Sequence, residues 1–104
     1  MARKSRSLAQ ASTCAAKLKV LADPTRLAVL EALMAAPQHV GALQQRLGVE
    51  QSLLSHHLQT LREAGLVEAE RDGKAVLYRL APGVAAARPG GAAIDLGCCL
   101  LSFD

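Results

Sequence analysis

Aromatic residues are almost absent from this sequence of 104 residues, which has no Trp, one Tyr and one Phe. Aromatic and β-branched side chains favour strands, whereas the Ala and Leu that supply most of the apolar residues favour helices. Apolar residues still make up 51% of the chain, which is enough for a core and argues against disorder. We therefore expect one small, mainly helical domain, to which oligomerisation would add stability.

Long hydrophobic runs are missing as well, and no stretch approaches the roughly 18–20 apolar residues of a membrane-spanning helix. The basic residues 1–6 are not followed by an apolar segment, so we expect no secretory signal. The sequence contains neither a Gly-rich phosphate loop nor a Gly-x-Ser-x-Gly motif, and no pair of carboxylates is placed for acid–base work. These absences predict a cytoplasmic protein that is neither an enzyme nor embedded in a membrane.

Cysteine is scarce, with three residues at Cys14, Cys98 and Cys99. An odd number without a secretory signal argues against a disulfide framework, so we expect reduced thiols. The simplest role of such thiols is packing, because a free Cys behaves as a small apolar residue. Acidic residues are fewer than basic ones, 9 against 12, which gives a net charge of +3 and permits nucleic-acid binding without establishing it.

The spacing of the apolar residues predicts four helices, over residues 8–21, 24–36, 40–47 and 51–64. After Gly65 the apolar period changes from 3.6 to 2, which predicts strands at 66–71 and 75–80 joined by Asp72 and Gly73 in a hairpin. A short helix is expected at 84–87, and the apolar tail after it is ambiguous. We therefore divide the chain into a flexible basic arm (1–7), a folded domain (8–88) and a tail containing two cysteines (89–104).

Two short helices joined at residues 48–50 and followed by a hairpin have the order of a winged helix-turn-helix. The fourth predicted helix turns Leu54, Leu58 and Leu61 to one side. Its other side is polar, with hydrogen-bonding groups that suit base edges and phosphates, and the helix N-terminus would favour phosphate. The residues predicted to contact DNA, including two at the hairpin tip, are Gln51, Ser52, Ser55, His56, Gln59, Arg62, Arg71 and Lys74.

The two neighbouring histidines should have different environments. His57 borders the apolar side of the helix, so we expect a structural, hydrogen-bonded side chain, whereas His56 points outward towards DNA. Neither histidine has a second ligand one helical turn away, which argues against a zinc site there. His39 is expected to be exposed or to start a helix.

These motifs together resemble the ArsR/SmtB family over about residues 14–80. The resemblance implies a dimeric winged-helix repressor of bacteria that leaves its operator DNA when a metal ion, metalloid or sulfur species binds. It also implies that the first and last helices form the dimer interface. The segments that carry the resemblance are residues 19–27 (KVLADPTRL), 51–58 (QSLLSHHL), 61–67 (LREAGLV), 72–74 (DGK) and 78–80 (YRL).

Two ligand patterns of that family are absent from this sequence. Residues 39–44 (HVGALQ) lack the Cys-x-Cys pair of an arsenic-sensing version, and the Ala-rich region of the last helix lacks the His of a zinc-sensing version. Cys14, Cys98 and Cys99 remain as candidate ligands. Thiolates select soft ions, and As(III) or Sb(III) prefers three of them in a pyramid. Gly97 and the break at 90–91 would allow both adjacent sulfurs to reach one ion, and Cys14 could come from either protomer.

Several functions remain open at this point. The first is a repressor that As(III) or Sb(III) releases from DNA. The same fold could instead respond to Cd, Pb, Hg or Zn, or to a persulfide that links two cysteines. A DNA-binding or protein-interaction module without a ligand is a further alternative. An oxidoreductase is the least supported reading, because adjacent cysteines lack the Cys-x-x-Cys spacing.

Overall fold

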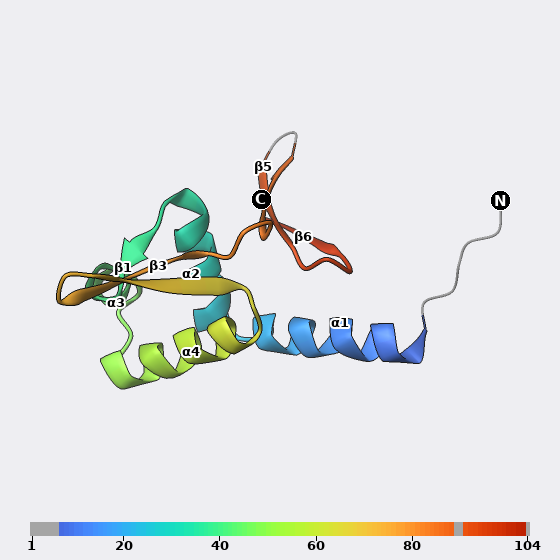
Figure 1. The fold of residues 1–104 in the computed structure, drawn as a ribbon, viewed down its shortest axis with the longest axis horizontal. Helices are drawn as coiled ribbons and strands as arrows, with labels where there is room; N and C mark the ends of the chain where they lie inside the picture. Colours follow the sequence, from blue (N-terminus) through green and yellow to red (C-terminus); the bar gives the residue numbers. More distant parts are fainter. Residues whose placement is uncertain (1–6, 89–90, 104) are drawn as a thin grey trace.

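A computed structural model describes residues 7–88 and 91–103 of the chain (Figure 1). Residues 1–6 of the predicted basic arm lie outside the described residues, as does Gly90 of the predicted break, whereas Ser7 caps the first helix. The elements are α1 (Leu8–Leu21), α2 (Pro24–Ala35), β1 (Gln38–His39), α3 (Val40–Leu47), α4 (Gln51–Glu63), β2 (Val67–Asp72), β3 (Ala75–Leu80), β4 (Ala85–Arg88), β5 (Gly91–Asp95) and β6 (Leu100–Phe103).

The four predicted helices are present, and their ends agree with the prediction to within a residue. Asp23 caps α2, since its carboxylate accepts hydrogen bonds from the backbone N–H groups of Thr25 and Arg26. Gly48 ends α3 with φ of 64°, a left-handed conformation in which a residue with a Cβ would be strained. The chain then turns directly into α4, so α3 and α4 form the helix-turn-helix.

The predicted hairpin forms the wing, with β2 and β3 paired antiparallel. Asp72 pairs with Ala75, so the two loop residues are Gly73 and Lys74 rather than Asp72 and Gly73. Of the two predicted turn residues, only Gly73 has a positive φ, 64°. The short strand β1, which the sequence did not predict, pairs with the other edge of β3 and completes a sheet in the order β1-β3-β2.

The C-terminal segment differs from the prediction. Residues 84–87 were expected to form a helix, but Ala85–Arg88 is strand β4, which pairs with β5 in a second sheet of order β4-β5-β6. Ala has a high helix propensity, but pairing with β5 outweighs it, as tertiary context often does for a short segment. Among the described residues no helix follows α4, so the expectation of a dimer interface on a last helix is wrong for this part of the chain.

The core lies where α2, α3, α4 and the wing meet, and the tail belongs to it. Leu30, Leu54 and Leu58 are fully buried there. Ile94 of β5 and Leu96, which follows that strand, are buried in the same cluster. The tail is therefore packed against the domain, while α1 extends from the body along the long axis of the molecule (Figure 1).

Candidate functional site

The two faces of α4 differ as the sequence predicts. Leu54, Leu58 and Leu61 are fully buried and fix the helix against the core. The polar residues predicted to contact DNA are exposed, both on α4 and at the wing. They are Gln51, Ser52, Ser55, His56, Gln59, Arg62, Arg71 and Lys74. Because the apolar face is held by packing, the exposed face is presented in a fixed orientation, which groove recognition requires.

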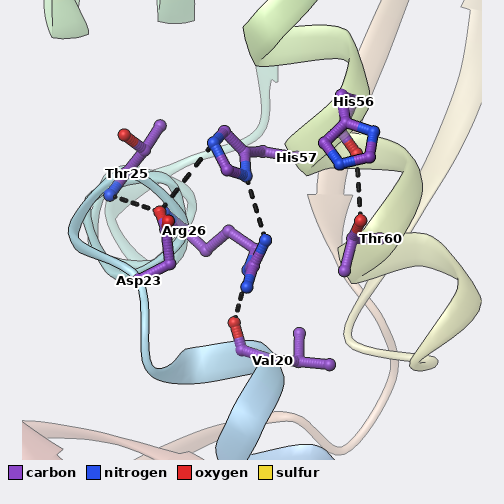
Figure 2. A network of polar contacts seen from close by, with 7 residues as sticks. All are labelled: Val20, Asp23, Thr25, Arg26, His56, His57 and Thr60. Carbon is purple, nitrogen blue, oxygen red and sulfur yellow. Dashed lines mark hydrogen bonds and ion pairs between the residues drawn. The ribbon is translucent and has the colours of Figure 1, made fainter.

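The two histidines of α4 have separate environments. His57 is 8% exposed, and its Nδ1 lies 3.1 Å from Nη1 of Arg26, which confirms the predicted structural role (Figure 2). His56 is exposed, and its ring, 5.8 Å from that of His57, makes no contact with Arg26 or Asp23 (Figure 2). His57 can therefore pack in the interior, while His56 keeps a polar side chain on the outer face of α4.

Arg26 connects three helices, a contact that the sequence did not predict. Its Nε donates a hydrogen bond to the backbone oxygen of Val20 in α1, while its Nη1 meets His57 in α4 (Figure 2). The backbone N–H of Arg26 also donates to Asp23, and this bond is the main reason that the pKa of Asp23 is lowered from its usual 3.8. Nδ1 and Nε2 of His57 thus face Arg26 and Asp23, with 3.9 Å between Nε2 and the carboxylate.

The N-terminus of α4 does not offer a free phosphate site, which corrects one expectation from the sequence. The side chain of Glu50 accepts hydrogen bonds from the backbone N–H groups of Ser52 and Leu53 and from the Ser52 hydroxyl. These bonds, led by that from the Ser52 backbone, lower the pKa of Glu50 from its usual 4.5. A carboxylate that caps the helix occupies the donors a phosphate would use and adds negative charge beside them.

A polar contact holds the tip of the wing. Nε2 of His39 lies 2.8 Å from the carboxylate of Asp72, which joins the start of α3 to the end of β2. His39 begins α3, as one of the two expectations for it stated, but its side chain forms no helix cap. This contact therefore links the wing tip, which carries Arg71 and Lys74, to the N-terminus of α3.

The three cysteines lie together although 84 positions separate the first two. Cys14 of α1 forms a disulfide with Cys98, with an S–S distance of 2.05 Å. The Sγ atom of Cys99 lies 3.9 Å from that of Cys14 and 4.0 Å from that of Cys98. The expectation of reduced thiols is therefore wrong for two of the three residues. Counting cysteines cannot reveal such a pair, because the contact depends on how the tail folds back onto α1.

A tight turn between β5 and β6 presents Cys98 and Cys99. Gly97 has φ of 85°, and its N–H donates to the carboxylate of Asp95 over 2.7 Å. The N–H of Leu96 donates to the backbone oxygen of Cys99 over 2.9 Å, which closes the turn. Adjacent side chains on a regular strand point to opposite faces, so this turn is what brings both sulfurs to the same side.

The three sulfurs can serve as soft-metal ligands in the reduced protein. Ligand atoms of all three lie within 4.8 Å of one another, and no His or carboxylate of the described residues joins the group. Thiolates around a tetrahedral ion with bonds of about 2.3 Å are roughly 3.8 Å apart, which is near the distances measured from Cys99. Cys14 is buried and the other two are half-buried, so the cluster is sheltered and still reachable.

The helix-turn-helix region matches a known family. The sequence model described as "Bacterial regulatory protein, arsR family" matches residues 23–69, which extend from the cap of α2 into β2. None of the three cysteines lies in the matched segment. The family likeness thus concerns the helix-turn-helix, and the cysteine cluster is built from the parts of the chain on either side of it.

Individual relatives agree with this match. The regulator NmtR of Mycobacterium tuberculosis is 41% identical over 70 residues, which are 67% of this chain and 58% of NmtR. The biofilm growth-associated repressor of Xylella fastidiosa is 40% identical over 77 residues, 74% of this chain and 68% of the repressor. This chain thus spans little more than half the length of NmtR.

A solved structure supports the fold. The homodimeric winged helix-turn-helix DNA-binding domain of Mb0332 from Mycobacterium bovis superimposes with a TM-score of 0.66 at 36% sequence identity. The alignment covers 78% of this chain and 76% of that one. Among the described residues, no helix is both long and apolar enough to cross a membrane.

Proposed function

This chain belongs to the ArsR family of bacterial regulatory proteins, and we propose that it is a repressor whose DNA binding is controlled by its own three-cysteine cluster. It would bind operator DNA as a homodimer in the cytoplasm and leave the DNA when As(III) or Sb(III) binds Cys14, Cys98 and Cys99. The observation that carries this proposal is the convergence of three sulfurs from α1 and the tail within 4.8 Å.

The exposed face of α4 supports the DNA-binding part of the proposal. Ser55 and His56 are exposed near its middle, where a recognition helix meets base edges, while Arg71 and Lys74 at the wing would meet phosphates. A dimer would place two copies of α4 one helical turn of DNA apart, about 34 Å. The exposed Leu8 and Leu18 of α1 make that helix a suitable dimer contact.

The composition of the cluster supports As(III) or Sb(III) as the ligand. Three thiols can replace the three hydroxyl groups of arsenous acid, which forms three As–S bonds and releases three molecules of water without any change in oxidation state. The product is a pyramid with three sulfur ligands, and three sulfurs are what the cluster contains. A tetrahedral divalent ion would need a fourth ligand.

The disulfide must be reduced before all three sulfurs can bind an ion. Two molecules of a cellular thiol would supply the electrons, giving the thiols of Cys14 and Cys98 and one external disulfide. Disulfides in cytosolic proteins are usually transient or redox-sensing, which fits such a step. The same geometry supports the alternative that a persulfide oxidises the reduced Cys14 and Cys98 to their disulfide, because these two sulfurs lie within bonding distance. The S–S bond of the persulfide is broken in that step, and one thiol and one molecule of hydrogen sulfide are released.

Arg26 provides a physical route from the cluster to DNA. Ligand binding changes DNA affinity only if the two dimer conformations bind the ligand differently. Cys14 lies in α1, and Arg26 ties the end of α1 to His57 in α4. A shift of α1 would therefore reach the recognition helix through two side chains, and a small rotation would spoil the fit to successive major grooves.

Release of DNA by arsenite tests the proposed function. The reduced protein, bound to DNA from its own promoter region, should dissociate when arsenite is added, and cadmium and a persulfide donor are tested beside it. The double variant Cys98→Ser/Cys99→Ser should bind DNA normally but no longer respond. Leu100→Ala, an exposed change in the same tail, is the matched control. Normal release of the double variant would contradict the thiol site.

The DNA-binding face has its own test. Ser55→Ala and His56→Ala should each weaken operator binding by about 1–3 kcal/mol if these side chains read bases. Glu31→Gln, an exposed change on α2, should leave binding nearly unchanged. Wild-type affinity of both α4 variants would mark this face as passive, and a chain that binds no DNA at low salt would contradict the repressor itself.

A further inference from the structure

Lys17 forms a direct link between α1 and the turn that carries two of the cysteines. It follows Cys14 by three positions, which places both side chains on one face of α1. Its Nζ donates a hydrogen bond to the backbone oxygen of Leu96 over 2.9 Å. A Cβ built on Gly97 would lie 3.9 Å from the same Nζ, so the ammonium group lies against the turn itself.

Hydrogen bonds within the turn connect Leu96 to both cysteines. Leu96 is 2% exposed, and its N–H is bonded to the oxygen of Cys99. The Asp95 carboxylate fixes the N–H of Gly97 from the other side of the turn. The backbone oxygen of Leu96, which accepts the hydrogen bond from Lys17, therefore belongs to the same hydrogen-bonded turn as Cys98 and Cys99.

This link matters most when the disulfide is reduced. In the oxidised protein the bond between Cys14 and Cys98 ties α1 to the turn. Reduction removes that bond, and Cys14 then depends on non-covalent contacts to remain beside the other two sulfurs. The hydrogen bond from Lys17 is charge-assisted and starts one helical turn from Cys14, so it keeps α1 in the same register against the turn.

We propose that Lys17 is a positioning residue that docks the cysteine turn onto α1 and so keeps the reduced cluster ready to bind a ligand. This proposal rests on the proposed function where the ligand is concerned. A ligand site that is held in place before binding loses less free energy to ordering, so its affinity is higher. Lys17 itself touches no ligand and donates no atom to it.

Arsenite binding provides the first test. Titration of the reduced full-length protein with arsenite should show that Lys17→Met binds roughly tenfold more weakly than wild type, which corresponds to about 1.4 kcal/mol. Lys17→Arg, which keeps a charged donor, should recover most of the affinity. Lys19→Met is the matched control, because Lys19 is an exposed lysine two positions later on α1.

A second measurement does not depend on arsenite. In a Cys99→Ser background, the equilibrium between the Cys14–Cys98 disulfide and the two thiols is measured in a glutathione redox buffer. This equilibrium reports how often Cys14 and Cys98 meet, and Lys17→Met should shift it several-fold towards the thiols, while Lys19→Met should not. The unfolding temperature of each variant is measured as well. If Lys17→Met only lowered the overall stability, its unfolding temperature would fall while the disulfide equilibrium stayed as in wild type.

The two measurements separate the failure of either proposal. If wild type does not bind arsenite but Lys17→Met still shifts the disulfide equilibrium, the positioning role stands and the metalloid function is wrong. If Lys17→Met matches wild type in the disulfide equilibrium, the positioning role is overturned, whatever the ligand. Equal effects of Lys17→Met and Lys19→Met would also overturn it, because the loss would then reflect charge alone.

Discussion

Arg26 of α2 and His57 of α4 lie in direct contact, with 3.1 Å between Nη1 of Arg26 and Nδ1 of His57. The ring is almost buried, so it needs this polar partner. Because the same guanidinium binds the end of α1, the contact joins α4 to the helix that carries Cys14. The histidine beside it, His56, lies in none of these contacts and faces solvent.

The neighbouring histidines allow a paired prediction. His57→Ala should destabilise the protein by about 1–3 kcal/mol, because the change leaves the half-buried guanidinium of Arg26 without its partner. His56→Ala should change the free energy of unfolding by no more than about 0.5 kcal/mol while weakening operator binding. Urea unfolding and DNA titration of both variants check this. Similar unfolding curves for the two would contradict the structural role of His57.

Asp23 should make the stability depend on pH at the acidic end. Its folded pKa is lowered, chiefly by the hydrogen bond from the Arg26 backbone, so its ionised form stabilises the folded state above the usual pKa of 3.8. That contribution is lost as the pH falls below 3.8 and through the folded pKa. Asp23→Asn keeps a good helix cap without the charge, so its stability should vary less with pH there.

Thermal unfolding between neutral pH and about pH 3 measures this difference. Asp23→Ala, which removes the cap as well, should lose about 0.5–2 kcal/mol at neutral pH. A constant gap between wild type and Asp23→Asn across the acidic range would show that the charge of Asp23 does not stabilise the folded state.

Glu50 should oppose DNA binding while it stabilises the start of α4. Its carboxylate accepts two backbone N–H groups and the Ser52 hydroxyl, and it lies beside the predicted DNA face. Glu50→Gln removes the negative charge and should raise the affinity for DNA, most clearly at low salt. Fluorescence anisotropy over a range of salt concentrations measures the effect. Glu31→Gln, which removes an exposed acid of α2, is a charge-matched comparison; an equal gain there would make the effect one of net charge.

The tail should contribute to global stability. Leu96 is 2% exposed and belongs to the main core cluster, so Leu96→Ala should cost about 2–5 kcal/mol. Leu100 is 53% exposed in the same tail, and Leu100→Ala should cost no more than about 0.5 kcal/mol. Chemical unfolding of the reduced proteins makes the comparison without the disulfide. A small loss for Leu96→Ala would mean that the tail does not share the core.

The sequence predicted those parts of the fold whose signals are local. Leu54, Leu58 and Leu61 recur at helical spacing, and that spacing alone fixes which side of α4 is buried and which polar residues face outward. The hairpin was predicted from Asp72 and Gly73 as residues that accept positive φ, and Gly73 is the one that adopts it. In each case the residues that decide the structure lie within a few positions of one another, so they can be recognised before the chain is folded.

Contacts between distant segments were decided by the tertiary structure. The Ala-rich residues after Gly83 favour a helix by propensity, but pairing with β5 makes them a strand. Cys14 and Cys98 are 84 positions apart, and nothing near either residue signals that α1 and the β5–β6 turn will meet. The bond from Lys17 to Leu96 has the same origin. Such contacts depend on the packing of the whole chain, so the sequence names the candidate ligands but only the fold assembles them into one site.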